Sequence, residues 1–172
     1  MLYISAEKFT QQYVDSVKKN NRNDFIHFYQ LIDVLIIDDV QFFSGKSGTQ
    51  DVFFHIFNHL HQNGKQVVLT SDKAPVDMQE IEQRLLSRFK WGLSAELQTP
   101  DYETRISIIK NKLSRDGVEM EDDIIFYVAK HIKTNIRELE GAIISLMAQS
   151  SFNKKQITLD LAKVIVCLLY TT

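Results

Sequence analysis

The stretch DVLIIDDVQFF, residues 33–43, decides the fold class of this chain. Its run VLII, residues 34–37, is apolar without alternation, which is typical of a strand covered on both faces in a parallel sheet. Asp38 and Asp39 end that run. Two adjacent carboxylates are costly inside a core, so they require a polar setting. In a parallel sheet that setting is the edge beyond the carboxyl ends of the strands, where ligands bind.

The segments on either side of this strand alternate between strand and helix patterns. Further strands are predicted at residues 2–4, at QVVLTS (66–71) and at WGLSAEL (91–97). Helices are predicted at 5–20 with Ser5 as the cap, at 23–30, from about Thr49 to Gly64, and at 77–89 with Asp77 and Glu80 as a capping box. This order predicts an α/β fold, a partial parallel sheet sandwiched by helices.

The character of the sequence changes after Pro100. Four helical patterns follow with no strand pattern between them, at residues 101–117, 121–132, 135–150 and 158–169. We therefore expect two domains, an α/β core over residues 1–98 and a small all-α bundle over residues 99–172.

The composition excludes several protein classes. With 172 residues, 44% hydrophobic and 24% charged, the chain is typical of one domain, or of one domain with a small satellite. A net charge of −2 creates no bulk attraction to nucleic acid or membrane, so an anion-binding surface must be a local patch. No apolar run reaches the roughly 18 residues of a membrane span, and the N-terminus lacks a signal-peptide pattern. The single cysteine, Cys167, fits a reducing cytosol, so we expect a cytoplasmic protein.

Polar residues end two of the predicted strands. Asp38 and Asp39 can hold Mg²⁺ and orient an attacking water, or they can simply cap a loop. Thr70, Ser71 and Asp72 end the next strand, at the equivalent sheet edge. They can hydrogen-bond a water or a phosphate, or they can cap a helix.

Two arginines of the helix at 77–89 differ in their local partners. Glu80 is placed one turn before Arg84, so we expect those two side chains to pair. Arg88 has no acid three or four residues earlier. An exposed arginine without a local partner is suited to reach an external anion, although it can also be solvated.

Arg137 occupies an unfavourable position for a cation. Asn135 and Glu138 match a capping box, which places Arg137 in the first turn of its helix, near the positive end of the helix dipole. Gly141 removes a side chain one turn later and allows close approach by a ligand or a backbone. Either a bound anion or a salt bridge to Glu140 explains an arginine at this place.

Asp51, His55 and His59 recur at intervals of four residues. A zinc protease helix has the pattern His-Glu-x-x-His, whereas this segment is HIFNH without a further nearby ligand. The pattern favours partly exposed histidines over a metal site.

Five of these segments together resemble the AAA+ ATPase domain of the bacterial replication initiator family DnaA. They are LIIDDVQFF (35–43, Walker B type), FFHIFNHL (53–60), VVLTSD (67–72, sensor 1 type), RLLSRFKWGL (84–93, arginine-finger box) and NIRELEGAI (135–143, sensor 2 type). The resemblance runs over nearly the whole chain.

The resemblance implies ATP and Mg²⁺ as cofactors and assigns roles to individual residues. By this resemblance Asp38 would be a metal ligand, Asp39 would position water, and Asp72 with Ser71 would be the sensor. Arg88, supported by Arg84, would contact the γ-phosphate of a neighbouring protomer's nucleotide. Arg137 would contact the nucleotide of its own protomer.

Members of this family also insert helices between their second and third strands to grip single-stranded DNA, and residues 5–30 correspond to that region. The implied DNA contacts are Val14, Lys18, Lys19, Arg22 and, in the loop GKSG, Lys46. Gly48 stands where many relatives have an arginine. A solvated surface is the alternative for each lysine, and backbone binding would depend strongly on salt.

The pattern G-x-x-x-x-G-K-[ST], which cradles phosphates, does not occur in the sequence. We therefore expect a DnaA fragment that lacks the P-loop and the C-terminal DNA-binding domain. Such a fragment would bind ATP weakly or not at all and would not hydrolyse it alone. Expected partners are DnaA protomers, through an exposed sheet edge and the AAA+ interface, and origin DNA. The alternatives are a nucleotide-independent single-stranded DNA-binding module and a regulatory module that presents Arg88 to an intact initiator.

Overall fold

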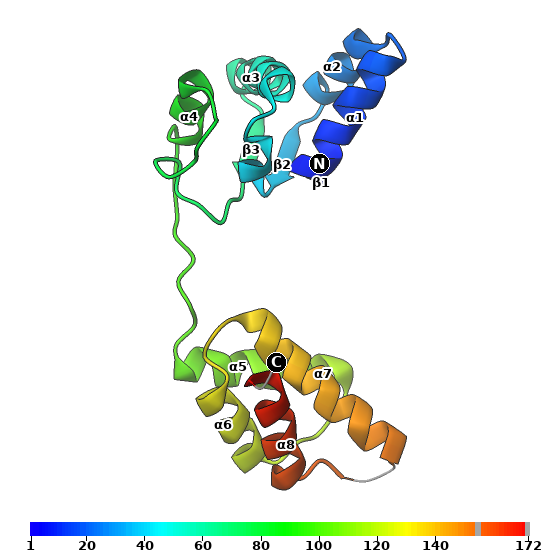
Figure 1. Cartoon of the computed structure of the whole chain (residues 1–172), viewed down its shortest axis with the longest axis vertical. Helices are drawn as coiled ribbons and strands as arrows, with labels where there is room; N and C mark the ends of the chain where they lie inside the picture. The colour runs from blue at the N-terminus through cyan, green and yellow to red at the C-terminus, as the bar shows by residue number, and fades with distance from the viewer. Residues whose placement is uncertain (154–155, 171–172) are drawn as a thin grey trace. The chain divides into compact units, whose positions relative to one another are not determined.

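The computed structural model describes residues 1–153 and 156–170. The chain divides into two compact units, Met1–Ala95 and Glu96–Thr172, and each has its own hydrophobic core (Figure 1). The boundary predicted between residues 98 and 99 lies near that division.

The first unit is built on a parallel sheet, as predicted. Its strands are β1 (Leu2–Ser5), β2 (Val34–Asp38) and β3 (Gln66–Leu69), in the order β1-β2-β3. The register places Ser5 opposite Asp38 and Ile37 opposite Leu69, so the strands end at a common edge. The parallel α/β fold class is confirmed.

The helices of the first unit lie beside this sheet. They are α1 (Ala6–Lys18), α2 (Arg22–Gln30), the 3₁₀ helix η1 (Val40–Phe43), α3 (Ser47–Gln62) and α4 (Gln83–Phe89). Both α1 and α3 pack directly against the sheet. Ser5 caps α1 as predicted, because its hydroxyl accepts a hydrogen bond from the backbone N–H of Lys8. Figure 1 shows α1, α2 and α3 on the same side of the sheet.

An aromatic cluster forms the centre of this core. The ring of Phe9 in α1 lies between 4.9 and 5.7 Å, centroid to centroid, from the rings of Phe25, Tyr29, Phe43 and Phe53. Edge-to-face packing of this kind adds to the hydrophobic gain from burial. Helices α1, α2, α3 and η1 are thus joined to one another through a single buried ring.

The two faces of the three described strands differ in burial. Leu35 and Ile37 are fully buried beneath the helices. The alternating positions form a row on the other face, where Tyr3 is paired with Ile36 and Ile36 with Val68. Val68 is 41% exposed and Tyr3 is 62% exposed, because no described helix lies over that row.

Two further sequence expectations are corrected. Residues 91–97 form no strand; Leu93 and Leu97 are 99% and 96% exposed, and a strand without a neighbour leaves its backbone hydrogen bonds unmade. The helix predicted from Asp77 begins only at Gln83, so Asp77 and Glu80 form no capping box. Glu80 adopts φ 56°, and its carbonyl accepts hydrogen bonds from Gly45 and Gln50.

The second unit is a helical bundle, as the four sequence patterns predicted. Its helices are α5 (Tyr102–Asp116), α6 (Asp122–His131), α7 (Ile136–Asn153) and α8 (Leu159–Tyr170). Their apolar stripes meet in one core that includes Ile109, Val128, Leu146 and Ala162. Within the described ranges, no helix combines the length and the apolar character needed to cross a bilayer.

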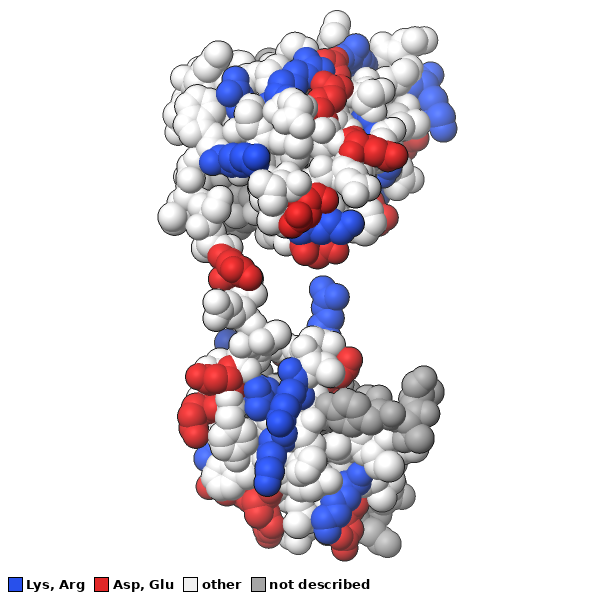
Figure 2. All heavy atoms as spheres, turned by 60° about the vertical axis from the view of Figure 1, so that its left-hand side comes forward, with Lys and Arg blue, Asp and Glu red and all other residues white. Residues whose placement is uncertain are grey.

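Charged side chains are mixed in sign over the surface. On the face drawn in Figure 2, lysine and arginine side chains are interspersed with aspartate and glutamate on both units. This distribution agrees with the net charge of −2. Any binding of anions would therefore depend on local groups of side chains.

Candidate functional site

Asp38 ends β2 between a donor from β1 and a donor from the residue that follows β3. Residues two apart on a strand share a face, so Tyr3 of β1 projects from the same face of the sheet as Asp38, which pairs with Ser5. The Tyr3 hydroxyl donates to Asp38 Oδ2 at 2.5 Å, and the Thr70 hydroxyl donates to Asp38 Oδ1. Asp38 is half-buried. The two hydrogen bonds hold its carboxylate at the edge of the sheet, where strand polarity predicted it.

Asp39 turns the chain out of the sheet. It adopts the left-handed conformation, φ 59° and ψ 52°, which aspartate tolerates better than most residues. Its backbone N–H donates to Thr70 Oγ1 at 3.0 Å, and Gln41 Nε2 donates to Asp39 Oδ1 at 3.1 Å. The backbone N–H of Val40 donates to the Thr70 carbonyl at 2.9 Å. The turn that carries the second carboxylate is thus pinned to the end of β3.

The two carboxylates set the electrostatics of this edge. The hydrogen bond to Asp38 is the main cause that raises the pKa of the Tyr3 phenol, followed by partial desolvation and by the negative charges of Asp38 and Asp39. The phenol therefore stays protonated and able to donate.

Thr70 is the residue of the TSD segment that contacts both aspartates. Ser71 and Asp72 lie in the turn that follows, where the backbone N–H of Lys73 donates to Ser71 Oγ at 3.0 Å. Asp72 lines an open pocket on the first unit. The sensor role predicted for Ser71 and Asp72 stays a prediction.

The donor set at this edge fits Mg²⁺. Proteins usually bind Mg²⁺ through one or two carboxylates, while the ion keeps several waters and contacts substrate phosphates. Asp38 and Asp39 supply such a pair. Among the residues that the structure describes, no group of three or more His, Cys, Asp or Glu is placed to hold a metal. The arrangement therefore suits a cation bound together with phosphate, and it does not suit a closed zinc site.

Arg84 is engaged by acids of its own unit. Its guanidinium lies 3.0 Å from Asp51 Oδ1 and 2.5 Å from Glu82 Oε2. Hydrogen bonds to Glu82 and then to Asp51 raise the pKa of Arg84. The predicted pair with Glu80 is wrong, because α4 begins at Gln83 and the one-turn relation does not extend back to Glu80.

Arg88 has a different environment on the same helix. Its Nε donates to Asn58 Oδ1 at 2.9 Å, and its guanidinium lies 5.6 Å from the ring centroid of Phe54 and 5.0 Å from that of Trp91. Trp91 in turn packs on His61, with ring centroids 4.1 Å apart. The side chain is half-buried, where the sequence indicated exposure. Among the described residues no carboxylate lies within salt-bridge distance of Arg88.

Arg137 lies in the second unit, in the first turn of α7. Asn135 Oδ1 accepts a hydrogen bond from the backbone N–H of Glu138 at 2.7 Å, so the predicted Asn135 cap is confirmed. Arg137 is exposed, and neither Glu140 nor another described acid pairs with it. Outside the backbone of its own helix and its two chain neighbours, no atom lies within 4 Å of the position that a Cβ on Gly141 would take, so this side of the turn is open.

The predicted DNA-contacting residues lie on the surface of the first unit. Val14 and Lys18 are exposed on α1, Lys19 is exposed at its C-cap, and Lys46 is exposed just before α3. Arg22 is also exposed, but it lies 3.5 Å from Asp51 Oδ2 and over the ring of Tyr13. Part of its charge is therefore already balanced within the unit.

His55 and His59 project from α3 near Asp51. His55 Nε2 lies 3.6 Å from Asp51 Oδ1, and His55 is exposed while His59 is half-buried. Asp51 also contacts Arg22 and Arg84, so its role is to link three helices.

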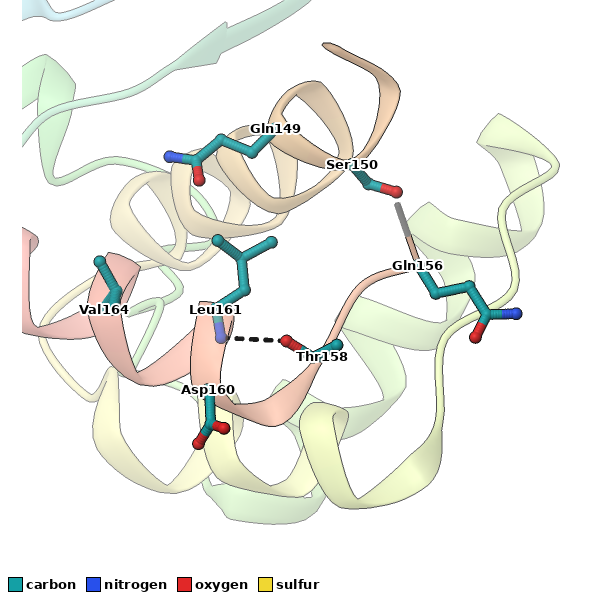
Figure 3. A pocket seen from close by; sticks show the side chains of 7 residues that line it. All are labelled: Gln149, Ser150, Gln156, Thr158, Asp160, Leu161 and Val164. Atoms are coloured by element: carbon teal, nitrogen blue, oxygen red, sulfur yellow. Dashed lines mark hydrogen bonds between the residues drawn. The ribbon is translucent and has the colours of Figure 1, made fainter. Parts of the chain in front are cut away.

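A separate hollow lies between α7 and α8 in the second unit. Its lining side chains, shown in Figure 3, are Gln149, Ser150, Gln156, Thr158, Asp160, Leu161 and Val164. Thr158 Oγ1 accepts a hydrogen bond from the backbone N–H of Leu161 at 3.3 Å, as at a helix cap. None of the predicted site residues lines this hollow.

Comparison with known proteins decides the family. The family model of the bacterial DnaA ATPase domain matches residues 1–96. The chain belongs to the bacterial DnaA ATPase domain family. The chromosomal replication initiator proteins DnaA of Flavobacterium psychrophilum and Bacteroides fragilis are 82% and 57% identical to it over 166 residues. Each alignment covers 96% of this chain and 35% of the relative, so the chain spans about a third of the length of these relatives.

Solved DnaA structures share this fold. Domain III of the Thermotoga maritima replication initiation protein DnaA matches with a TM-score of 0.92 and 42% identity, covering 95% of this chain and 68% of the other. A replication initiator DnaA bound to AMPPCP and single-stranded DNA matches with a TM-score of 0.79 and 42% identity, covering 85% of this chain and 45% of that one. The DnaA and AAA+ resemblance read from the five segments is confirmed.

Two residues of the edge were missed by sequence reasoning. Tyr3 and Gln41 donate to Asp38 and Asp39. Gln41 is two residues from Asp39 in the sequence, so a hydrogen bond between their side chains could have been predicted from this short separation. Tyr3 stands 35 residues before Asp38, and only the strand register brings them together.

Proposed function

We propose that this chain is the part of a DnaA-type replication initiator that supplies the carboxylate pair and the trans-acting arginine of an ATP-dependent switch. The observation that carries the proposal is the pair Asp38 and Asp39 at the carboxyl edge of a sheet that is similar to DnaA domain III of Thermotoga maritima. The whole initiator would use ATP to control the opening of the replication origin, in the cytoplasm.

Each carboxylate has a distinct part in this proposal. Bound Mg²⁺ would neutralise charge on the nucleotide phosphates. Asp38 would hold that cation, directly or through water, and Asp39 would orient the attacking water and accept its proton. Thr70 fixes both residues, since it donates to Asp38 and accepts from the backbone of Asp39. Ser71 and Asp72 would report the state of the nucleotide from the next turn.

Arg88 of the first unit and Arg137 of the second unit would contact the phosphates of two different nucleotides. Arg88 would reach the γ-phosphate of a neighbouring protomer's nucleotide, because the Asn58 amide and two aromatic rings hold its side chain without neutralising it. Arg84, which is already paired with Asp51 and Glu82, would support α4. Arg137 would contact the nucleotide of its own protomer from the helical unit.

We propose further that this chain alone binds ATP weakly or not at all and does not hydrolyse it. The sequence contains no G-x-x-x-x-G-K-[ST], so backbone amides that cradle the phosphates are not supplied by these residues. The test is a titration of fluorescent ATP with Mg²⁺ against wild type and Asp38→Ala. The expected result is no saturable binding to either; saturable micromolar binding that Asp38→Ala removes would contradict this proposal.

Single-stranded DNA is a second proposed ligand. The support is the exposure of Val14 and Lys18 on α1 and of Lys19 at its C-cap, and a DnaA relative solved with single-stranded DNA. Anisotropy of a labelled oligonucleotide should show binding that weakens with salt, and each lysine removed should lower the salt slope by about 0.7. Lys110→Ala, in the second unit, is the control and should leave the slope unchanged; an equal fall in this control would argue against α1 as the DNA surface.

A regulatory role is the remaining candidate, because Arg88 carries no carboxylate partner within the described residues. In that role the chain would associate with protomers of an intact initiator and present Arg88 to their nucleotide. Addition of the chain to a full-length relative should then change its ATP hydrolysis. Arg88→Ala should abolish the effect, and an effect that survives this substitution would rule the role out.

A further inference from the structure

We propose that Tyr3 is a positioning residue for the carboxylate of Asp38. The proposal rests on the proposed function of Asp38 as the carboxylate that holds Mg²⁺. Tyr3 belongs to none of the motifs on which the family resemblance is based, and it lies on a strand at the edge of the sheet.

The geometry gives Asp38 one hydroxyl donor from β1 and one from the residue that follows β3. Tyr3 Oη donates to Oδ2 from β1, and Thr70 Oγ1, directly after β3, donates to Oδ1. Each donor is set by the parallel register, which pairs Tyr3 with Ile36 and ends β3 beside Ile37. The carboxylate is therefore held from both sides in one orientation.

The exposure of Tyr3 makes a purely structural role a poor explanation. The residue is 62% exposed on the open face of the sheet, so its ring contributes little burial. Its hydroxyl nevertheless makes a 2.5 Å hydrogen bond to a charged acceptor, and such bonds are about twice as strong as neutral ones. The contact orients Asp38 more than it stabilises the core.

This orientation matters for binding of a cation. A carboxylate has about four acceptor positions, and a cation held by Asp38 would share this group with the two hydroxyls, which take one position on each oxygen. Groups that hydrogen-bond a metal-binding carboxylate fix its direction, and their loss typically weakens metal affinity by about 10- to 100-fold. Loss of the Tyr3 hydroxyl should therefore weaken the cation site without removing either carboxylate.

The test is a titration of the isotope-labelled chain with Mn²⁺ alone, followed by paramagnetic broadening of backbone amide signals. Broadening confined to residues near 38–41 and 70 defines binding at the sheet edge. The variants are Tyr3→Phe, Asp38→Asn and the matched control Tyr29→Phe. Tyr29 also donates its hydroxyl to one side chain, Gln12, but from within the aromatic cluster.

The expected result is a Mn²⁺ concentration for half-broadening that rises about tenfold in Tyr3→Phe and stays unchanged in Tyr29→Phe. Asp38→Asn should abolish the local broadening. Signals distant from the edge report whether each variant is folded.

Two outcomes overturn the proposal, and they are distinguishable. An unchanged midpoint in Tyr3→Phe, with broadening lost in Asp38→Asn, removes the positioning role and leaves the proposed role of Asp38 intact. Broadening near 38–41 that is missing in wild type, or that survives in Asp38→Asn, removes the proposed metal role and the positioning role with it.

Discussion

At the scale of single residues, Phe9 has the most demanding packing environment. Four aromatic rings surround it, and it is fully buried. We expect Phe9→Ala to lower the free energy of unfolding by about 3–5 kcal/mol, because the surrounding rings cannot close the cavity. Urea unfolding followed by circular dichroism measures the change. Phe28→Ala removes a phenyl that is half-exposed and should have a much smaller effect; equal losses would mean that the cluster is not the centre of the core.

Gly45 combines a left-handed backbone with a close contact. Its φ is 70°, and a Cβ added there would lie 3.0 Å from Glu80 Oε2. We expect Gly45→Ala to lower the free energy of unfolding by about 1–2 kcal/mol, since a side chain disfavours this conformation. Gly64→Ala is the control, because Gly64 has φ 66° and nothing within 4 Å. If the two variants lose the same stability, the contact with Glu80 contributes nothing.

The candidate site shows how far residue-level reasoning extends. The carboxylates were placed at the sheet edge from the apolar run before them and from strand polarity alone. Thr70 was expected at the equivalent edge, but Tyr3 was not, because only the strand register brings it to Asp38. The partner of Arg84 was predicted wrongly for a similar reason, since Asp51 belongs to a helix 33 residues earlier in the chain.

At the scale of elements, the cap of α5 makes stability of the helical unit depend on pH. The Asp101 carboxylate accepts a hydrogen bond from the backbone N–H of Thr104 at 2.8 Å, and this bond lowers the pKa of Asp101. The charged cap is therefore fully stabilising above the ordinary pKa of aspartate. That contribution is lost as pH falls through the lower folded value.

We expect the midpoint of thermal unfolding to fall over that acidic window by a larger amount in wild type than in Asp101→Asn. Asparagine also caps helices, but it does not titrate. Circular dichroism melts at a series of pH values measure this difference. Equal pH dependence in the two proteins would show that the cap is not responsible.

Elements were predicted well where packing agrees with the local apolar pattern, and wrongly where it does not. The four helices after Pro100 and the strand at 34–38 have patterns that packing reinforces. The segment at 77–82 has a helical pattern, yet Met78 and Ile81 are buried in the first core, and the backbone turns at Glu80 to place them there. Residues 91–97 have a strand pattern but no adjacent strand to pair with in the described structure.

At the scale of the whole molecule, the two units have separate cores. We expect residues 96–172, expressed alone, to fold into a helical bundle that melts cooperatively, because its core lies within its own four helices. Far-ultraviolet circular dichroism and thermal melting provide the measurement. Leu146→Ala, which truncates a fully buried side chain of that core, should abolish or strongly lower the transition. A broad, non-cooperative melt of the unsubstituted unit would contradict the expectation.

The contact between Arg88 and Trp91 makes Trp91 an intrinsic fluorescent probe of the environment of Arg88. Trp91 is the only tryptophan in the sequence, and it is partly open to solvent while its indole meets both a guanidinium and an imidazole. Its emission wavelength and intensity depend on those two neighbours. Intrinsic fluorescence, excited near the red edge of indole absorption, therefore requires no added label. It reports on the surface where Arg88 would contact the phosphate of a neighbouring protomer's nucleotide.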